Sequence, residues 1–476
     1  MSPRNESQDA PAVIKEAIPP QPALGRAIDR RRFVSEISRG LILSRIPTVL
    51  GVSAFSSFPI MGLEKPTTRD MPSSLKGDAL YRDVIKWAEF SSHQTGYPGD
   101  LATGDWIAER LKSAGFEVEF QQYSIPLFFL DQASLTVDGR AVECFPLWIP
   151  AATGSKPISG SMVAFSSNAD GADRYAGKIV LFPVGEVQKP GFQFSALKIV
   201  QAGAAALIVV APQPAGVVTA WNSGPPFNRR PQPRPAVLVG ANDSDQLQKA
   251  ASTGQTATIE ITGEFRPQGS TRNVIGRLNR KKDRWIIVST PASGWFRCAS
   301  ERGSGVAVFL GLAEWAASLK LDCNWLFCAT SGHELGHAGV LHLLGSSILP
   351  EPKSTACFLS LGASVAAREW EKVDGNWRPL NRLTRRLNLV STVSLADAVR
   401  PAFAPILQVK ATDQPEGGEL AHIMSKGYAA FGLFGDHLWF HTKQDGPETT
   451  DAALLELLGG PLVKSLQESL TVRKSG

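Results

Sequence analysis

The stretch from residue 324 to residue 342 carries the side chains best suited to chemistry. It reads NWLFCATSGHELGHAGVLH and contains His333, Glu334 and His337. In an HExxH motif, two histidines one helical turn apart bind zinc and the glutamate between them acts as the general base. The motif therefore predicts a metallopeptidase site with a single zinc ion, in which Glu334 activates the water.

The residues just before this motif favour a different local structure. The apolar run from Trp325 to Ala329 has the length of a buried strand, and Thr330 to Gly332 are the small residues that end it. His333 is then expected at the end of a strand and not inside a helix, where the zinc motif needs it. A third ligand for a single zinc ion would have to come from His342 or His441.

A strand followed by an acidic residue and a Gly-x-x-Gly turn into a helix resembles another zinc motif. It is similar to the EExGxxG segment of the dizinc aminopeptidase family, the exopeptidases related to glutamate carboxypeptidase and the transferrin receptor. Glu334, Gly336 and Gly339 keep the spacing of that segment. The resemblance implies that Glu334 is a zinc ligand and that His333 stands where the family has its catalytic glutamate.

The same resemblance assigns positions to the other metal ligands. Pro291 stands in place of the first histidine, Ser300 in place of the bridging aspartate and Gly362 in place of a further carboxylate. His441, in the FHTxxD-like segment, keeps the last histidine. Glu301 follows the bridging position and would reach the metals only if its loop were shifted by one residue.

Under this resemblance, the sequence retains two of the family's metal ligands, Glu334 and His441, and lacks three. Proline and glycine offer no side-chain donor, so we expect zinc to bind weakly or not at all. The sequence then predicts a peptide- or protein-binding pseudo-peptidase. One alternative is an active peptidase with a rewired single-zinc site at His333, Glu334 and His337. Another is a weak zinc site formed by Glu301, Glu334 and His441 after the loop shift.

The remaining histidines give weaker predictions. His93 lies in a polar segment and is expected to be solvated. His422 matches no ligand position and is expected at the surface. His437 lies near His441, where it either supports the site or is exposed.

Strands alternate with helical patterns over most of the chain after residue 75. This alternation predicts an α/β fold with a mixed, mostly parallel sheet sandwiched by helices, as in the zinc exopeptidases. Strands are expected at 285–289, 325–329, 356–361 and 429–434, and helices at 306–319 and 451–470.

The segment 126–264 has a different pattern, with short strands broken by Gly, Pro and Asp. Its apolar runs, such as 177–182 and 203–210, follow one another in an order that resembles the β-rich protease-associated domain. The resemblance implies an insertion that divides the peptidase-like domain into a first part, 63–125, and a second part, 265–476.

Residues 1–62 are expected to be a disordered tail followed by an export segment. Arg30 and Arg31, followed by Phe33, resemble the twin-arginine signature, and a moderately apolar stretch comes after them. Arg45 interrupts that stretch, so no transmembrane span is predicted. The signal would place the protein in the periplasm or at the cell surface, whereas without it the protein would be cytoplasmic.

Composition limits the classes of protein to which this chain could belong. The chain has 476 residues, 43% of them hydrophobic and 20% charged, which suits a globular protein with a large core. Its net charge of +5 is small for this length, so nucleic acid is not an expected partner. Five cysteines are too few and too scattered for a disulfide framework, and buried thiols are expected.

Overall fold

The computed structural model describes residues 71–168, 171–223 and 230–472. The predicted tail and twin-arginine segment lie outside these residues. In the part of the chain that is described, no helix is both long enough and apolar enough to cross a membrane.

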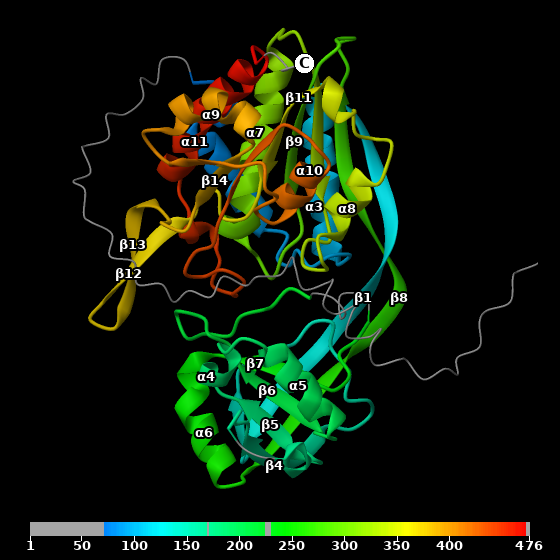
Figure 1. Ribbon diagram of the computed structural model, residues 1–476, viewed down its shortest axis with the longest axis vertical. Helices are drawn as coiled ribbons and strands as arrows, with labels where there is room; N and C mark the ends of the chain where they lie inside the picture. The colour runs from blue at the N-terminus through cyan, green and yellow to red at the C-terminus, as the bar shows by residue number, and fades with distance from the viewer. Residues whose placement is uncertain (1–70, 169–170, 224–229, 473–476) are drawn as a thin grey trace, which may run out of the picture. The chain divides into compact units, whose positions relative to one another are not determined.

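One large sheet forms the centre of the fold (Figure 1). In spatial order its strands are β15 (Val409–Ala411), β14 (Asn388–Ser391), β16 (Ala430–Phe434), β11 (Thr355–Leu361), β9 (Trp285–Pro291), β10 (Asn324–Thr330), β8 (Thr256–Leu278) and β1 (Glu117–Val137). The middle strands β16, β11, β9 and β10 run parallel. Strand β8 pairs antiparallel with β10 and β1, and β14 pairs antiparallel with β16 but parallel with β15. This mixed, mostly parallel sheet confirms the predicted α/β fold.

Helices cover both faces of this sheet because side chains alternate along the buried strands. In β10, Phe327 belongs to one hydrophobic cluster and Leu326 to the cluster on the opposite face. The first face is covered by α2 (Gly77–Ala88), α3 (Pro98–Ser113), α7 (Ser304–Ser318), α9 (Ala396–Phe403) and α11 (Ala452–Ser469). The second is covered by α8 (Ala338–Leu344) and α10 (Glu419–Ser425).

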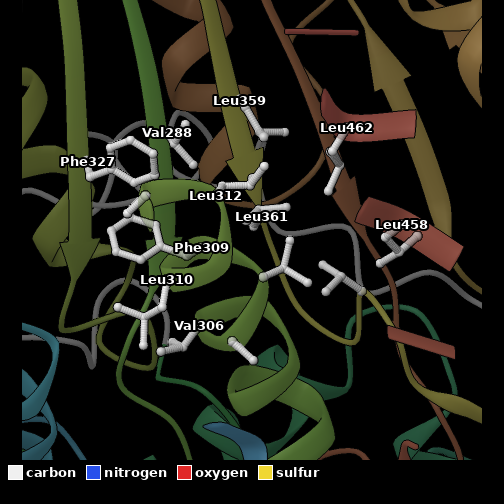
Figure 2. Packing of buried hydrophobic residues seen from close by; sticks show 14 of the residues in the cluster. Val288, Val306, Phe309, Leu310, Leu312, Phe327, Leu359, Leu361, Leu458 and Leu462 are labelled. Atoms are coloured by element: carbon white, nitrogen blue, oxygen red, sulfur yellow. The ribbon is translucent and has the colours of Figure 1, made fainter. Parts of the chain in front are cut away.

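Helix α7 is the most buried helix of the first face. It is apolar nearly all round, as expected for a helix enclosed in a core. Figure 2 shows Phe309 and Leu312 of α7 close to Phe327 and Leu359 of the sheet. The predictions of a helix at 306–319 and a closing helix at 451–470 are confirmed by α7 and α11.

Strands β1 and β8 form a long antiparallel ribbon. Their pairing runs from Glu117 opposite Arg277 to Val137 opposite Ala257, with two shifts of register on the way. The predicted domain boundaries, 125/126 and 264/265, both fall inside these strands. The ribbon therefore continues from the central sheet into a second group of strands.

In that second group four neighbouring strands pair in parallel and a fifth pairs antiparallel at their edge, and their side chains enter two further hydrophobic clusters. Val180 and Leu238 face one of these clusters, and Ile208 faces the other. The strands are β2 (Arg140–Val142), β3 (Cys144–Pro146), β4 (Ile158–Ala164), β5 (Ile179–Phe182), β6 (Ala206–Val210) and β7 (Ala236–Val239), and the helices are α4 (Val184–Val187), α5 (Phe192–Gln201) and α6 (Ser244–Ser252).

Two further features bear on the sequence predictions. The charged stretch 368–386, for which the sequence suggested no element, contains a hairpin of β12 (Arg368–Val373) and β13 (Asn376–Leu383). All five cysteines are free thiols, and four of them are buried, while Cys144 is partly exposed.

Candidate functional site

The candidate site lies at the carboxyl ends of the parallel strands, the edge at which open α/β sheets carry their sites. Pro291 is the last residue of β9, and Gly362 follows β11 directly. The segment 331–337 connects β10 to α8, and the segment 435–446 follows β16. The loops that carry the predicted site residues therefore meet at one edge of the sheet.

A turn of π-helix, η5 (Ala299–Gly303), leads into α7 and carries Glu301. A π turn contains one residue more than an α turn, a local shift of the chain often found at functional sites. The buried carboxylate of Asp445 holds this turn by accepting hydrogen bonds from the backbone N–H groups of Ser300 (2.9 Å) and Glu301 (3.0 Å). The Glu301 side chain is thereby fixed inside the site.

Glu301, Glu334 and His441 meet around an arginine that the sequence predictions did not include. The Nη2 atom of Arg302 lies 3.0 Å from Oε1 of Glu301 and 3.8 Å from Oε1 of Glu334. On its other side, Oε1 of Glu301 lies 3.2 Å from Nε2 of His441. Burial alone would raise the pKa of Glu301, but His441 and Arg302 lower that pKa to about 2.

The second carboxylate oxygen of Glu334 faces two hydroxyl groups. Its Oε2 accepts hydrogen bonds from Oγ of Ser293 at 2.8 Å and from Oγ1 of Thr95 at 3.0 Å. Burial raises the pKa of Glu334, while Arg302 and Ser293 act in the opposite direction. Ser293 also accepts a hydrogen bond from the backbone N–H of Gly332, so it fixes the loop that carries Glu334.

His333 belongs to a different cluster from Glu334. Its Nδ1 lies 3.0 Å from Oε1 of Glu419, and Oε2 of Glu419 accepts a hydrogen bond from Thr330. Burial, with Arg302 as the next cause, lowers the pKa of His333 well below its ordinary value. His333 is therefore held by a buried carboxylate in a setting that disfavours its protonated form.

His337 pairs with His422. Its Nδ1 lies 3.0 Å from Nε2 of His422, and its ring centre is 4.5 Å from that of His333. His422, which the sequence placed at the surface, is half-buried in this contact. Because α8 begins only at Ala338 and His337 has a φ of 60°, the two histidines of the HExxH motif do not lie on a helix.

A cavity of about 160 Å³ opens beside His333. Pro291 and Gly362, two residues assigned to lost metal positions, line it. Glu419 and Phe434 also face it, so the lining is largely apolar with one carboxylate–histidine pair.

The site residues predicted from the sequence thus fall into two clusters. One contains Glu301, Glu334 and His441, and the other contains His333 and His337. Arg302 and Glu419 are not among the predicted site residues, because their burial is set by loop contacts between distant segments. The only signal in the sequence was the charged pair Glu301–Arg302 inside an otherwise small and apolar stretch.

These residues do not fit a pair of zinc ions. Zinc needs donors with a free lone pair, and a guanidinium group stays protonated and offers none. Here Arg302 touches the two carboxylates that would be ligands. Among the described residues, no group of three His, Cys, Asp or Glu side chains is arranged to hold a metal ion.

Two further histidines are buried, so His437 does not take the exposed position that the sequence left open as one alternative, and His93 is not solvated as predicted. His437 is buried, with Nδ1 3.0 Å from Oγ of Ser364 and Nε2 3.5 Å from Oδ1 of Asp445. His93, expected to be solvated, is completely buried, contacts Oγ1 of Thr103 and stacks on Trp87. The prediction for His93 is wrong because the segment around it folds back under α2 and not out into solvent.

The burial of His93 gives a testable pH dependence. Burial lowers the pKa of His93 to about 3, whereas the unfolded chain titrates near 6.5. Between these values the unfolded state binds more protons, so stability falls as the pH falls. When the pH is lowered from 7 to 4.5, the free energy of unfolding of His93→Phe is expected to fall by about 2 kcal/mol less than that of the parent.

Urea unfolding at the two pH values measures this difference. His342→Phe, at an exposed histidine, serves as the control. Equal losses in the parent and His93→Phe would show that His93 is not responsible for the acid sensitivity.

Comparisons with known proteins bear on the fold. Neither a protein-family model nor a curated protein matches the chain. Solved structures do match. A zinc aminopeptidase from Bacillus subtilis is 20% identical, with a TM-score of 0.66, over 86% of this chain and 98% of its own.

Two other structures give the same result. An aminopeptidase from Aneurinibacillus sp. is 19% identical, with a TM-score of 0.59, over 83% of this chain and 94% of its own. A peptidase precursor from Shewanella amazonensis is 15% identical, with a TM-score of 0.66, over 84% of this chain and 95% of its own. The protein therefore has the fold of the zinc exopeptidases.

Proposed function

We propose that this protein binds peptides or proteins and does not carry out two-zinc hydrolysis. Three positions that the family resemblance assigns to metal ligands hold Pro291, Ser300 and Gly362, which supply no carboxylate or imidazole. The position of the catalytic base holds His333, which is turned toward Glu419. Together these substitutions would remove three of the five metal ligands and the base.

The observation that carries the binding function is the cavity beside His333. It has about 160 Å³ of space, and Pro291 and Gly362 stand on its wall where larger ligand side chains would project. Mostly apolar cavities with a few fixed polar groups are typical binding sites for small apolar groups. An apolar side chain of a peptide fits this cavity, with the His333–Glu419 pair as its polar contact.

Zinc analysis and an aminoacyl-anilide assay test the absence of two-zinc chemistry. We expect the purified protein to contain far less than two equivalents of zinc. We also expect any hydrolysis of the anilide to be the same in the parent and in Glu334→Ala. Two equivalents of zinc, with turnover that is lost in Glu334→Ala, would refute the proposal.

Peptide binding is tested separately with a library of fluorescent peptides. Ala363→Leu fills the cavity from its wall and is expected to weaken the binding of selected peptides about tenfold, which corresponds to 1.4 kcal/mol. Ala404→Leu, at an exposed alanine, is the matched control. If peptides selected for binding to the parent bound Ala363→Leu and Ala404→Leu equally well, the peptide-binding site would lie outside this cavity.

The second candidate function is that of a peptidase with one metal ion. It is favoured by the 3.0 Å contact between Nδ1 of His337 and Nε2 of His422, beside the ring of His333. Glu334 lies in the other cluster, so it would not be the base that the sequence predicted. One equivalent of zinc that is lost in His422→Ala, together with hydrolysis, would favour this function.

The domain organisation and export remain proposals. We propose that residues 126–264 form a protease-associated domain inserted in a peptidase-like domain made of residues 63–125 and 265–476. The parallel strands β5, β6 and β7, with one hydrophobic cluster whose buried residues all lie between Tyr175 and Leu238, support a separate insertion. The twin-arginine-like segment supports export to the periplasm or cell surface, which fractionation of cells would test.

A further inference from the structure

Arg302 is the one described arginine whose side chain is wholly buried among charged groups of the site. Its side chain has 0% exposure, and its Nε donates a hydrogen bond to the backbone oxygen of Ser293 at 3.0 Å. The η5 turn, which Asp445 holds in place, points this side chain into the core of the site. Its position is therefore fixed from both ends.

The Arg302 side chain contacts three loops, namely its own η5 turn and the loops after β9 and β10. Through Nη2 it contacts Glu301 on its own turn and Glu334 on the loop after β10. Through Nε it contacts the loop after β9, at Ser293. Since Ser293 also binds Glu334, these three loops are tied together around one positive charge.

The two carboxylates near Arg302 need a positively charged group beside them. Glu301 and Glu334 are both almost fully buried, with exposures of 0% and 2%. Buried carboxylates without a counter-charge are strongly destabilising, and removal of one partner of a buried pair leaves such a charge behind. A metal ion or a buried cationic side chain can supply the compensation, and Arg302 is in contact with both carboxylates.

We propose that Arg302 is a built-in structural cation that replaces the bound metal of this site. This inference rests on the proposed function only in assuming that no zinc pair occupies the site. The guanidinium carries one permanent charge and compensates Glu301 and Glu334 without any exchangeable ion. Folding of this protein is then independent of metal supply, whereas structural metal sites make folding depend on it.

A thermodynamic cycle tests this role. We expect Arg302→Met to lower the equilibrium constant for folding by about a hundredfold or more, because it removes the cationic side chain that Glu301 and Glu334 share, leaving the Glu301 carboxylate only His441 and the Glu334 carboxylate only its hydroxyl partners. Adding Glu301→Gln and Glu334→Gln to the same chain removes those charges and is expected to restore most of the stability. If Arg302 only fills space, the two glutamine substitutions give no rescue, and the proposal is wrong.

Metal ions give a second and independent measurement. The melting temperature of the parent is expected to be the same in a chelator and in micromolar ZnCl₂. In Arg302→Ala, Glu301, Glu334 and His441 become free to bind the ion, so ZnCl₂ is expected to raise the melting temperature. His441→Gln in the same chain is expected to remove that rise.

Two further results would overturn the proposal. One is a parent protein that binds zinc tightly and loses it on Glu301→Gln, because a metal ion would then hold the site with Arg302 present. The other is an Arg302→Met variant as stable as the parent. Neither measurement uses peptide binding, so a failure of the cycle and a failure of the proposed function are seen separately.

Discussion

Asp445→Ala is expected to destabilise the protein by about 4 kcal/mol. The Asp445 side chain accepts hydrogen bonds from the backbone N–H groups of Ser300 and Glu301 and from Oγ1 of Thr449. Each buried donor left without an acceptor costs about 1–3 kcal/mol. Because these groups are fully enclosed, water cannot replace the lost oxygens without opening the loop.

Urea unfolding at pH 7, followed by tryptophan fluorescence, measures the loss. Asp397→Ala is the matched control, since its side chain is 99% exposed and its contact with Arg400 is at the surface. We expect that control to change stability by less than about 0.5 kcal/mol. If the two alanine variants were equally stable, Asp445 would not be what holds the η5 turn.

Phe327→Ala is expected to cost about 3–5 kcal/mol, the range for removal of a buried aromatic side chain. Phe327 is fully buried in β10, and its ring lies 5.1 Å from that of Phe309 and 5.2 Å from that of Phe116, between ring centres. The cavity left behind lies between α7 and the sheet (Figure 2). The neighbouring elements are fully packed, so they cannot collapse into it.

The same unfolding measurement applies to this variant. Phe327→Leu retains most of the volume and is expected to cost about 1.5 kcal/mol at most. Phe194→Ala, at a phenylalanine that is 49% exposed in α5, controls for the loss of an aromatic ring as such. A cost below about 1 kcal/mol for Phe327→Ala would contradict this account of the core.

The fold could be predicted from the sequence because its elements are periodic and apolar. The run from Trp325 to Ala329 has the short length of a buried strand and is followed by small residues, and the apolar positions from Val306 onward repeat with the period of helix α7. Such patterns are set by the local chain, so they can be recognised without knowledge of the tertiary contacts. The hairpin β12–β13 lacks a consistent alternation, so nothing in the stretch 368–386 indicated it.

The candidate site could be predicted only in part. Glu301 and His441 come into contact through η5, and a π turn leaves no periodic signal in the sequence. The pairing of His333 with Glu419 joins residues 86 positions apart, and that of His337 with His422 joins residues 85 positions apart. Contacts of this kind follow from the packing of loops, which a motif read along one segment does not contain.

The β1–β8 ribbon has a consequence for the order of folding. Val137 and Ala257 are partners at one end of the ribbon, yet residues 138–256 separate them along the chain. Bringing such distant residues together has an entropic cost that grows with the length of the loop. Structure that forms early within the intervening segment shortens that loop, so we expect pairing to start at Val137 and proceed toward Glu117. The last pairs to close would then be those next to β10, and the central sheet would be completed late.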